Sequence, residues 1–314
     1  MALTDEIQTL TKAFTGLGVD ERSLVTILGK WKPEERQSFR KGNPNFFKED
    51  ERHFERCHED YVKRLEQEFM RFKKAIVLWT MHPWERDARM AKKAIKKGPE
   101  AYAVLVEIAC SRSSEELLGA RRAYHSLFEH SIEEDTSRYI KGSERKLLVA
   151  LVSAYRYEGS KVEEDHAKSE AKALANAIKN SDKKKLLEDD EVVRILATRS
   201  KPHIQAVYKQ YKQISDKNLD EDLEVALILK ETVQCLCSPE KYYAKVLDEA
   251  LKNGTNQKIR KALTRVIVTQ ADADMKNIRE EFQTKYGVAL SKKIEDTACG
   301  SYKDFLVNLV ARGN

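Results

Sequence analysis

The residues best suited to hold an ion stand near the N-terminus, in the segment Gly16-Leu17-Gly18. Glycine allows backbone conformations that are closed to other residues, so several carbonyl oxygens of one short loop can point outward together. Hard cations such as Ca²⁺ take six to eight oxygen ligands, and backbone carbonyls with one bidentate carboxylate supply many of them. We therefore expect a cation-binding loop, with Leu17 exposed at its tip as a contact to an apolar surface. A plain helix–helix turn, with an ordinary exposed leucine, is the alternative.

The elements around this loop recur four times along the 314 residues. Four stretches have apolar residues at their first, fourth and fifth positions, which is the spacing of one helix face: 24–31, 105–112, 192–199 and 263–270. Each is followed by a charged amphipathic segment, and then by a closing segment that is apolar nearly all round and must be buried in its own unit. No segment has the alternating pattern of a convincing β-strand.

The sequence therefore predicts an all-α fold of four homologous repeats, each of several short helices. The predicted bounds are 1–80, 81–158, 166–238 and 241–314. The connector Gly159–Asp165 is the longest, and we expect it to divide the chain into two pairs of repeats.

Composition excludes several classes of protein. Apolar residues make up 41% of the chain and charged residues 34%, which is typical of a folded protein with a large core. No run approaches the roughly 20 apolar residues of a membrane-spanning helix, and the first residues do not form a secretory signal. Five cysteines favour a reducing compartment, so we expect a cytoplasmic protein. The net charge of +6 is weak evidence for an anionic partner, and there is no recognisable nucleic-acid-binding module.

Several segments carry a resemblance to a known family. With the four-repeat register and the Gly-x-Gly loop, the chain resembles the annexins, and in particular the plant annexins with a longer first repeat, in the segments LWTMHPWERDA, RKLLVALVSAYRYEG and EVVRILATRS. The resemblance implies about five short helices per repeat, arranged as a curved disc. It also implies a peripheral protein, not an enzyme, in which Ca²⁺ bridges the protein to anionic phospholipid headgroups.

The resemblance further implies which residues bind calcium in the first repeat. The loop carbonyls carry over to Phe14, Gly16 and Gly18, and the acid of a later loop carries over to Glu68, with Glu66 as second choice. A charged insertion, Gly42–Phe54, lengthens the separation between loop and acid. A solvated acid on a helix face is the alternative for Glu68.

The other repeats depart from the family pattern. In the second repeat Tyr139 stands where an acid is expected, and in the third repeat three lysines, which repel a cation, follow Asp182, so we expect both sites to be lost. The fourth repeat keeps Asp296 and a degenerate first loop at Gly254, which predicts a weak site. A helix N-cap or a surface acid is an equal alternative for Asp296.

Two cysteines and one function remain open. Cys110 and Cys235 match a pair that the resemblance places close together as redox-active thiols, but buried, inert thiols are the favoured interpretation. The cluster His53, Cys57 and His58 has no second pair of ligands nearby, so a zinc site is not expected. The rival function is a helical scaffold for protein contact, with actin or with itself, whose membrane binding is driven by basic charge and needs no calcium.

Overall fold

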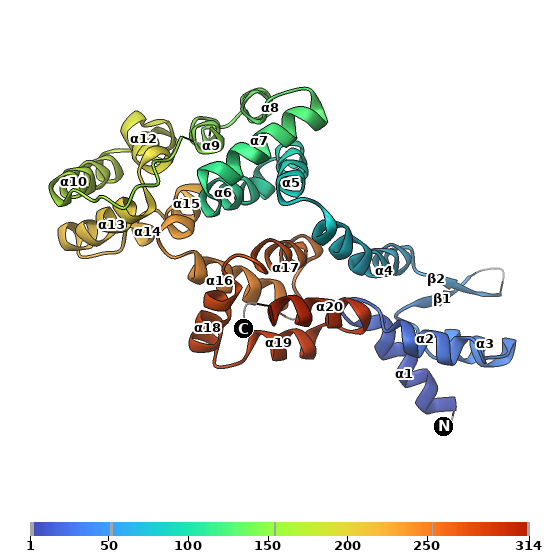
Figure 1. Ribbon diagram of the computed structural model, residues 1–314. Helices are drawn as coiled ribbons and strands as arrows, with labels where there is room; N and C mark the ends of the chain where they lie inside the picture. The colour runs from blue at the N-terminus through green and yellow to red at the C-terminus, as the bar shows by residue number, and fades with distance from the viewer. Residues whose placement is uncertain (1–2, 51–52, 154, 253, 313–314) are drawn as a thin grey trace. The chain divides into compact units, whose positions relative to one another are not determined.

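The computed structural model describes residues 3–50, 53–153, 155–252 and 254–312. Over these residues the chain forms 20 α-helices, one 3-10 turn and a two-stranded hairpin, which confirms the all-α prediction (Figure 1). The chain divides into two compact units, one made of residues 1–80 with 243–314 and the other of residues 81–242.

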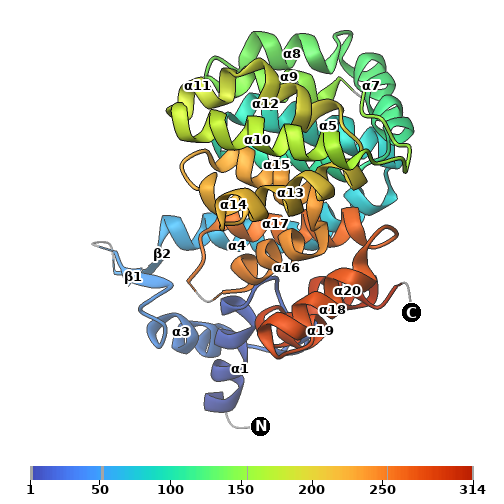
Figure 2. The same ribbon diagram turned by 90° about the vertical axis from the view of Figure 1, so that its left-hand side faces the viewer.

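The unit of residues 81–242 is continuous in sequence. Its first half holds α5 (Pro83–Lys97), η1 (Pro99–Ala101), α6 (Tyr102–Ser111), α7 (Ser114–Phe128), α8 (Ile132–Tyr139) and α9 (Glu144–Val152). Its second half holds α10 (Glu164–Asn180), α11 (Lys183–Glu188), α12 (Asp190–Thr198), α13 (Lys201–Ser215), α14 (Leu219–Asp222) and α15 (Leu227–Cys237). The two halves contact each other, since α9 packs on α12 (Figure 2) and α15 packs on α6 (Figure 1).

The other unit joins the two ends of the chain. The N-terminal part contributes α1 (Leu3–Thr15), α2 (Glu21–Leu28), α3 (Pro33–Lys41), β1 (Phe47–Glu49), β2 (Glu55–Cys57) and α4 (Glu59–Thr80). The C-terminal part contributes α16 (Pro239–Leu251), α17 (Gln257–Gln270), α18 (Met275–Tyr286), α19 (Leu290–Thr297) and α20 (Gly300–Val310). Here α17 packs on α4 and α20 packs on α2 and α4.

This division corrects the predicted pairing of repeats. The connector Gly159–Asp165 lies inside one unit, so the first repeat combines with the fourth and the second with the third. The physical reason is that the closing helix of one repeat buries its apolar surface against a helix of its partner as well as of its own repeat, as α9 does on α12 and α6. Connector length follows the course of the chain and carries no information about which apolar faces match.

The periodic stretches form buried faces. In α6, α12 and α17 the apolar residues at the first, fourth and fifth positions of the stretch are all buried, at 0–5% exposure. In α2, Leu24 and Ile27 are buried but Leu28, at 37% exposure, is not. The first repeat is therefore the least complete of the four in its helical packing.

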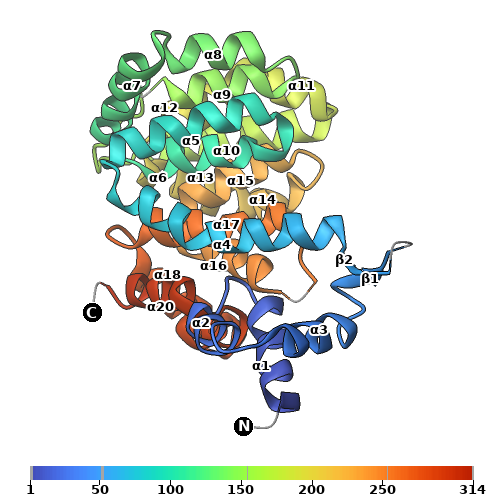
Figure 3. The same cartoon turned by 90° about the vertical axis from the view of Figure 1, so that its right-hand side faces the viewer.

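The first repeat also departs from the others in its elements. Residues 59–80, where the resemblance implies a loop at Glu68, form the single 22-residue helix α4 (Figure 3). The expectation of no strands is wrong, because β1 and β2 pair in antiparallel register with Phe47 opposite Cys57. The hairpin belongs to the insertion and adds aromatic side chains to the core. Phe46 stacks on Tyr61 of α4 with ring centroids 4.4 Å apart. Aromatic burial thus compensates for the shortened helical face.

Candidate functional site

The Gly16–Gly18 loop lies between α1 and α2 and is fixed at both ends. Asp20 caps α2 by accepting a hydrogen bond from the Ser23 amide at 3.2 Å. Gly18 has φ +92°, and a Cβ atom on it would lie 2.9 Å from the carbonyl oxygen of Cys299. A Cβ atom on Gly16 would lie 2.7 Å from the Cys299 sulfur. Both glycines are therefore required by the close approach of the loop to the α19–α20 connection.

The predicted exposure of Leu17 is wrong. Its side chain is 2% exposed, and its carbonyl oxygen accepts a hydrogen bond from the Cys299 amide at 3.0 Å, in a parallel bridge between Leu17 and Ala298. The loop folds onto the fourth repeat, where the leucine gains an apolar environment without a membrane. Leu17 therefore does not serve as a membrane contact in this conformation.

Glu68 lies beside the loop, in the middle of α4. Its side chain is 3% exposed, and one carboxylate oxygen accepts a hydrogen bond from the Gly18 amide at 2.8 Å. Arg71 forms a bidentate ion pair with the carboxylate, its second contact being 2.9 Å, and the side-chain amide of Gln257 donates to the carboxylate at 3.0 Å. Glu66, the second choice, is exposed. The structure thus places Glu68, across 50 residues of sequence, at the glycine loop.

The environment of Glu68 favours its charged form. Burial by itself would raise the pKa of the carboxyl group, but the hydrogen bonds from Arg71, Gln257 and Gly18 outweigh it, so the pKa lies below its ordinary value of 4.5. A carboxylate has about four acceptor positions, and here four hydrogen bonds fill them.

The second arginine of α4 contacts the loop itself. The carbonyl oxygen of Phe14 accepts a hydrogen bond from the Arg64 guanidinium at 3.1 Å. Two of the four predicted ligands, Phe14 and Glu68, are therefore each in contact with a guanidinium group of α4. The ligand types fit Ca²⁺, since a carboxylate and a backbone carbonyl, Glu68 and Phe14, lie at this loop, each beside a guanidinium group. Binding of a metal ion by Glu68 requires that at least one of its present hydrogen-bond donors be exchanged.

The predicted residues of the fourth repeat are not brought together in the same way. Asp296 lies on α19, half-exposed, and pairs with Lys292 of the same helix at 2.9 Å. Gly254 has φ +75° in an open position, with nothing within 4 Å of an added Cβ atom. Among the described residues no hydrogen bond joins Asp296 to the Gly254 loop, and Asn253 of that loop lies outside them.

The cysteines form a buried group in the other unit. Cys110 on α6 and Cys235 on α15 are 0% and 1% exposed, on helices that pack together. Burial raises the pKa of the Cys110 thiol to about 11, and burial together with the neighbouring Cys110 raises that of Cys235. These thiols have the environment of core residues. In the described part of the chain no group of three His, Cys, Asp or Glu side chains is arranged to hold a metal ion.

Sequence reasoning missed the partners of Glu68 and of the glycine loop. Arg71 was detectable, because an acid and a base three residues apart share a helix face. Gln257 and Cys299 were not, because both belong to the fourth repeat and reach the loop only through the pairing of first and fourth repeats.

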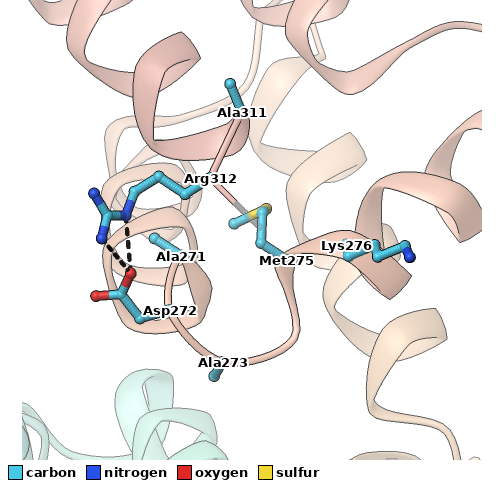
Figure 4. Close-up of a pocket in the computed structure, with 7 residues that line it drawn as sticks. All are labelled: Ala271, Asp272, Ala273, Met275, Lys276, Ala311 and Arg312. Atoms are coloured by element: carbon cyan, nitrogen blue, oxygen red, sulfur yellow. Dashed lines mark hydrogen bonds and ion pairs between the residues drawn. The ribbon is translucent and has the colours of Figure 1, made fainter. Parts of the chain in front are cut away.

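A separate surface pocket lies between the α17–α18 connection and the end of α20. Asp272 and Arg312 pair at 2.8 Å on one side of it, and Ala273, Met275 and Lys276 lie around the opening (Figure 4). None of the predicted site residues lines this pocket.

Comparisons with known proteins agree with this architecture. A family model described as "Annexin" matches residues 86–151, 171–227 and 242–309. The chain belongs to the annexin family. Annexins are typically non-enzymatic proteins that bind phospholipid membranes in a calcium-dependent way, and Ca²⁺ is the ion that the family uses.

The similar proteins include several from plants. The chain is 49% identical to Annexin D4 of Arabidopsis thaliana over 320 residues, covering all of both chains. It is 38% identical to Annexin-like protein RJ4 of Fragaria ananassa, over 98% of this chain and 95% of that protein. Among solved structures, annexin III superposes with a TM-score of 0.70 and 25% identity, over all of this chain and 95% of that one. No helix in the described ranges is long and apolar enough to cross a membrane.

Proposed function

We propose that this chain is a cytoplasmic protein that binds anionic phospholipid membranes in a calcium-dependent way through its first repeat. The proposed ligands are Glu68 and the carbonyl oxygens of Phe14, Gly16 and Gly18. The observation that carries the proposal is the contact between the Glu68 carboxylate and the Gly18 amide at 2.8 Å, which joins the acid to the glycine loop. The fourth repeat, with Gly254 and Asp296, is proposed as a weaker second site.

Each element of the first repeat has a part in this function. The α1 and α2 helices hold the ends of the loop, the two glycines let it approach the fourth repeat, and α4 presents the acid. When bound, calcium supplies coordination positions that the phosphoryl oxygens of lipid headgroups can fill. The protein's own contribution is a negative carboxylate held beside a loop whose carbonyls can turn outward.

The test is sedimentation with phosphatidylserine vesicles in the presence of Ca²⁺ or of EGTA. The wild-type chain should sediment only with Ca²⁺, and Glu68→Gln should require much more Ca²⁺ for the same bound fraction. Glu66→Gln is the matched control, because it removes the same charge from an exposed position two residues away on α4. Equal sedimentation of the wild-type chain in EGTA would refute the calcium-dependent mechanism.

One observation favours a second function. Guanidinium groups of the protein itself already occupy hydrogen-bond positions at Glu68 and at the Phe14 carbonyl, two of the proposed calcium ligands. The chain also carries a net charge of +6. The alternative is therefore a helical scaffold for actin or for self-association that adheres to anionic membranes by charge alone. Binding of that kind should fall steeply with ionic strength, because salt screens exposed charges beyond about 10 Å at 0.1 M. It should also be unchanged in Glu68→Gln.

A further inference from the structure

The Arg71 guanidinium occupies the Glu68 carboxylate, so a metal ion that binds this carboxylate has to compete with Arg71 for it. Its guanidinium group donates one hydrogen bond to each oxygen of the Glu68 carboxylate. Both side chains are buried, at 7% and 3% exposure, so neither charge is screened by water. Any cation that reaches Glu68 must either displace this guanidinium or share the carboxylate with a like charge, which is unfavourable in a buried position.

Gln257 gives Arg71 a second acceptor. This residue begins α17 in the fourth repeat, and its side-chain oxygen accepts a hydrogen bond from Arg71 while its side-chain nitrogen donates to Glu68. Gln257 thus bridges the guanidinium and the carboxylate and holds the two side chains together. The three side chains therefore form a clasp, defined here as Glu68, Arg71 and Gln257, that joins the first repeat to the fourth.

We propose that Arg71 is an internal cation that competes with Ca²⁺ for Glu68, and that Gln257 makes this exchange depend on the position of the fourth repeat. The inference rests on the proposed calcium site of the first repeat and adds its regulation. In the closed clasp the carboxylate has its acceptor positions filled, and the Gly18 amide holds the loop against the same carboxylate. Calcium binding at Glu68 then requires the clasp to open.

The test is isothermal titration calorimetry with CaCl₂ in the absence of lipid, with folding checked by circular dichroism. Arg71→Gln removes the competing charge and should raise the affinity of the Glu68 site for Ca²⁺ at least tenfold. Adding Glu68→Gln to this variant should abolish the gain. The matched control is Arg112→Gln, which breaks another buried arginine–carboxylate pair, with Asp87 in the other unit, and should leave calcium affinity unchanged.

Gln257→Ala is the second variant and keeps the inference testable if Arg71→Gln does not fold. It removes one hydrogen bond from each member of the pair and should raise calcium affinity by a smaller factor, two- to fivefold. An Arg71→Gln variant that folds and binds Ca²⁺ no more tightly than the wild type would overturn the inference. If Arg71→Gln does not fold, an unchanged affinity in Gln257→Ala would overturn it.

The two proposals can fail separately. If Glu68→Gln abolishes a calorimetric site but Arg71→Gln leaves its affinity unchanged, the calcium site stands and only the role of Arg71 is refuted. If Glu68→Gln leaves all calcium binding unchanged, the proposed site and the inference built on it are both refuted.

Discussion

Gly18→Ala tests whether the glycine loop is held by its approach to the fourth repeat. An alanine there has to adopt φ +92°, which costs roughly 1–2 kcal/mol for a residue with a side chain. Its Cβ atom would also lie 2.9 Å from the Cys299 carbonyl oxygen and 3.2 Å from the Cβ atom of Tyr302. Because the first of these is a backbone atom, the loop has to move, which adds about 1–3 kcal/mol. The expected loss in the free energy of unfolding is therefore about 3 kcal/mol.

The matched control is Gly287→Ala, at the C-terminus of α18. Gly287 has φ +70°, but nothing lies within 4 Å of an added Cβ atom. This variant should lose only the backbone part, roughly 1–2 kcal/mol. For a domain of this size each kcal/mol lowers the melting temperature by roughly 2–4 °C, so thermal unfolding followed by circular dichroism should separate the two variants clearly. Equal melting temperatures for Gly18→Ala and Gly287→Ala would refute the argument that the loop is constrained by Cys299.

Three further outcomes follow from buried charges and thiols. Asp87→Asn should lower the free energy of unfolding in urea by about 3–5 kcal/mol, because it removes the negative charge from the buried ion pair with Arg112; a loss under 1 kcal/mol would contradict this. Stability should fall in acid. Burial would raise the pKa values of Glu68, Asp135 and Glu170, but hydrogen bonds to their ionised forms outweigh it and hold these pKa values below the ordinary 4.5, 3.8 and 4.5. The stabilisation from these carboxylates is therefore complete above the ordinary pKa values and is lost as the pH falls through the folded pKa values. Glu170→Gln should flatten part of that decline in the free energy of unfolding, measured in urea titrations between pH 7 and pH 3. In alkylation followed by mass spectrometry, partly exposed Cys57 should react in the native protein, whereas Cys110 and Cys235 should react only after denaturation; native labelling of the buried pair would contradict the assignment as core thiols.

The sequence predicted the features that repeat and missed those that occur once. The helical stretches were recognisable because the same spacing of apolar residues returns four times, and the structure buries nearly all of them. The hairpin was missed because its strands are three residues each, too short for an alternating pattern to stand out, and charged residues dominate them. The continuous α4 was missed because the family pattern predicts a break where this chain has only helix-compatible residues.

For the candidate site, the proximity of Glu68 to the glycine loop could be predicted, but several of the contacts around both could not. Glycine spacing and the position of Glu68 were sufficient to select residues that the structure brings together. The burial of Leu17 and the position of Gln257 at Glu68 depend on contacts between residues 282 and 189 positions apart, and no local pattern encodes those contacts. A long-range contact of this kind becomes visible only when the pairing of the repeats is known.

The division of the chain into a continuous unit and a unit built from both ends has a consequence for its synthesis. Residues 81–242 can fold as soon as they leave the ribosome, whereas residues 1–80 need the last repeat before their apolar surfaces can be covered. At about 5–20 residues per second this delay is on the order of ten seconds. The N-terminal part has an apolar cluster of its own, in which Phe46 of the insertion stacks on Tyr61 of α4. The insertion thus has a use unrelated to ion binding: Phe46 adds apolar contacts that are local to residues 1–80 and do not depend on the last repeat.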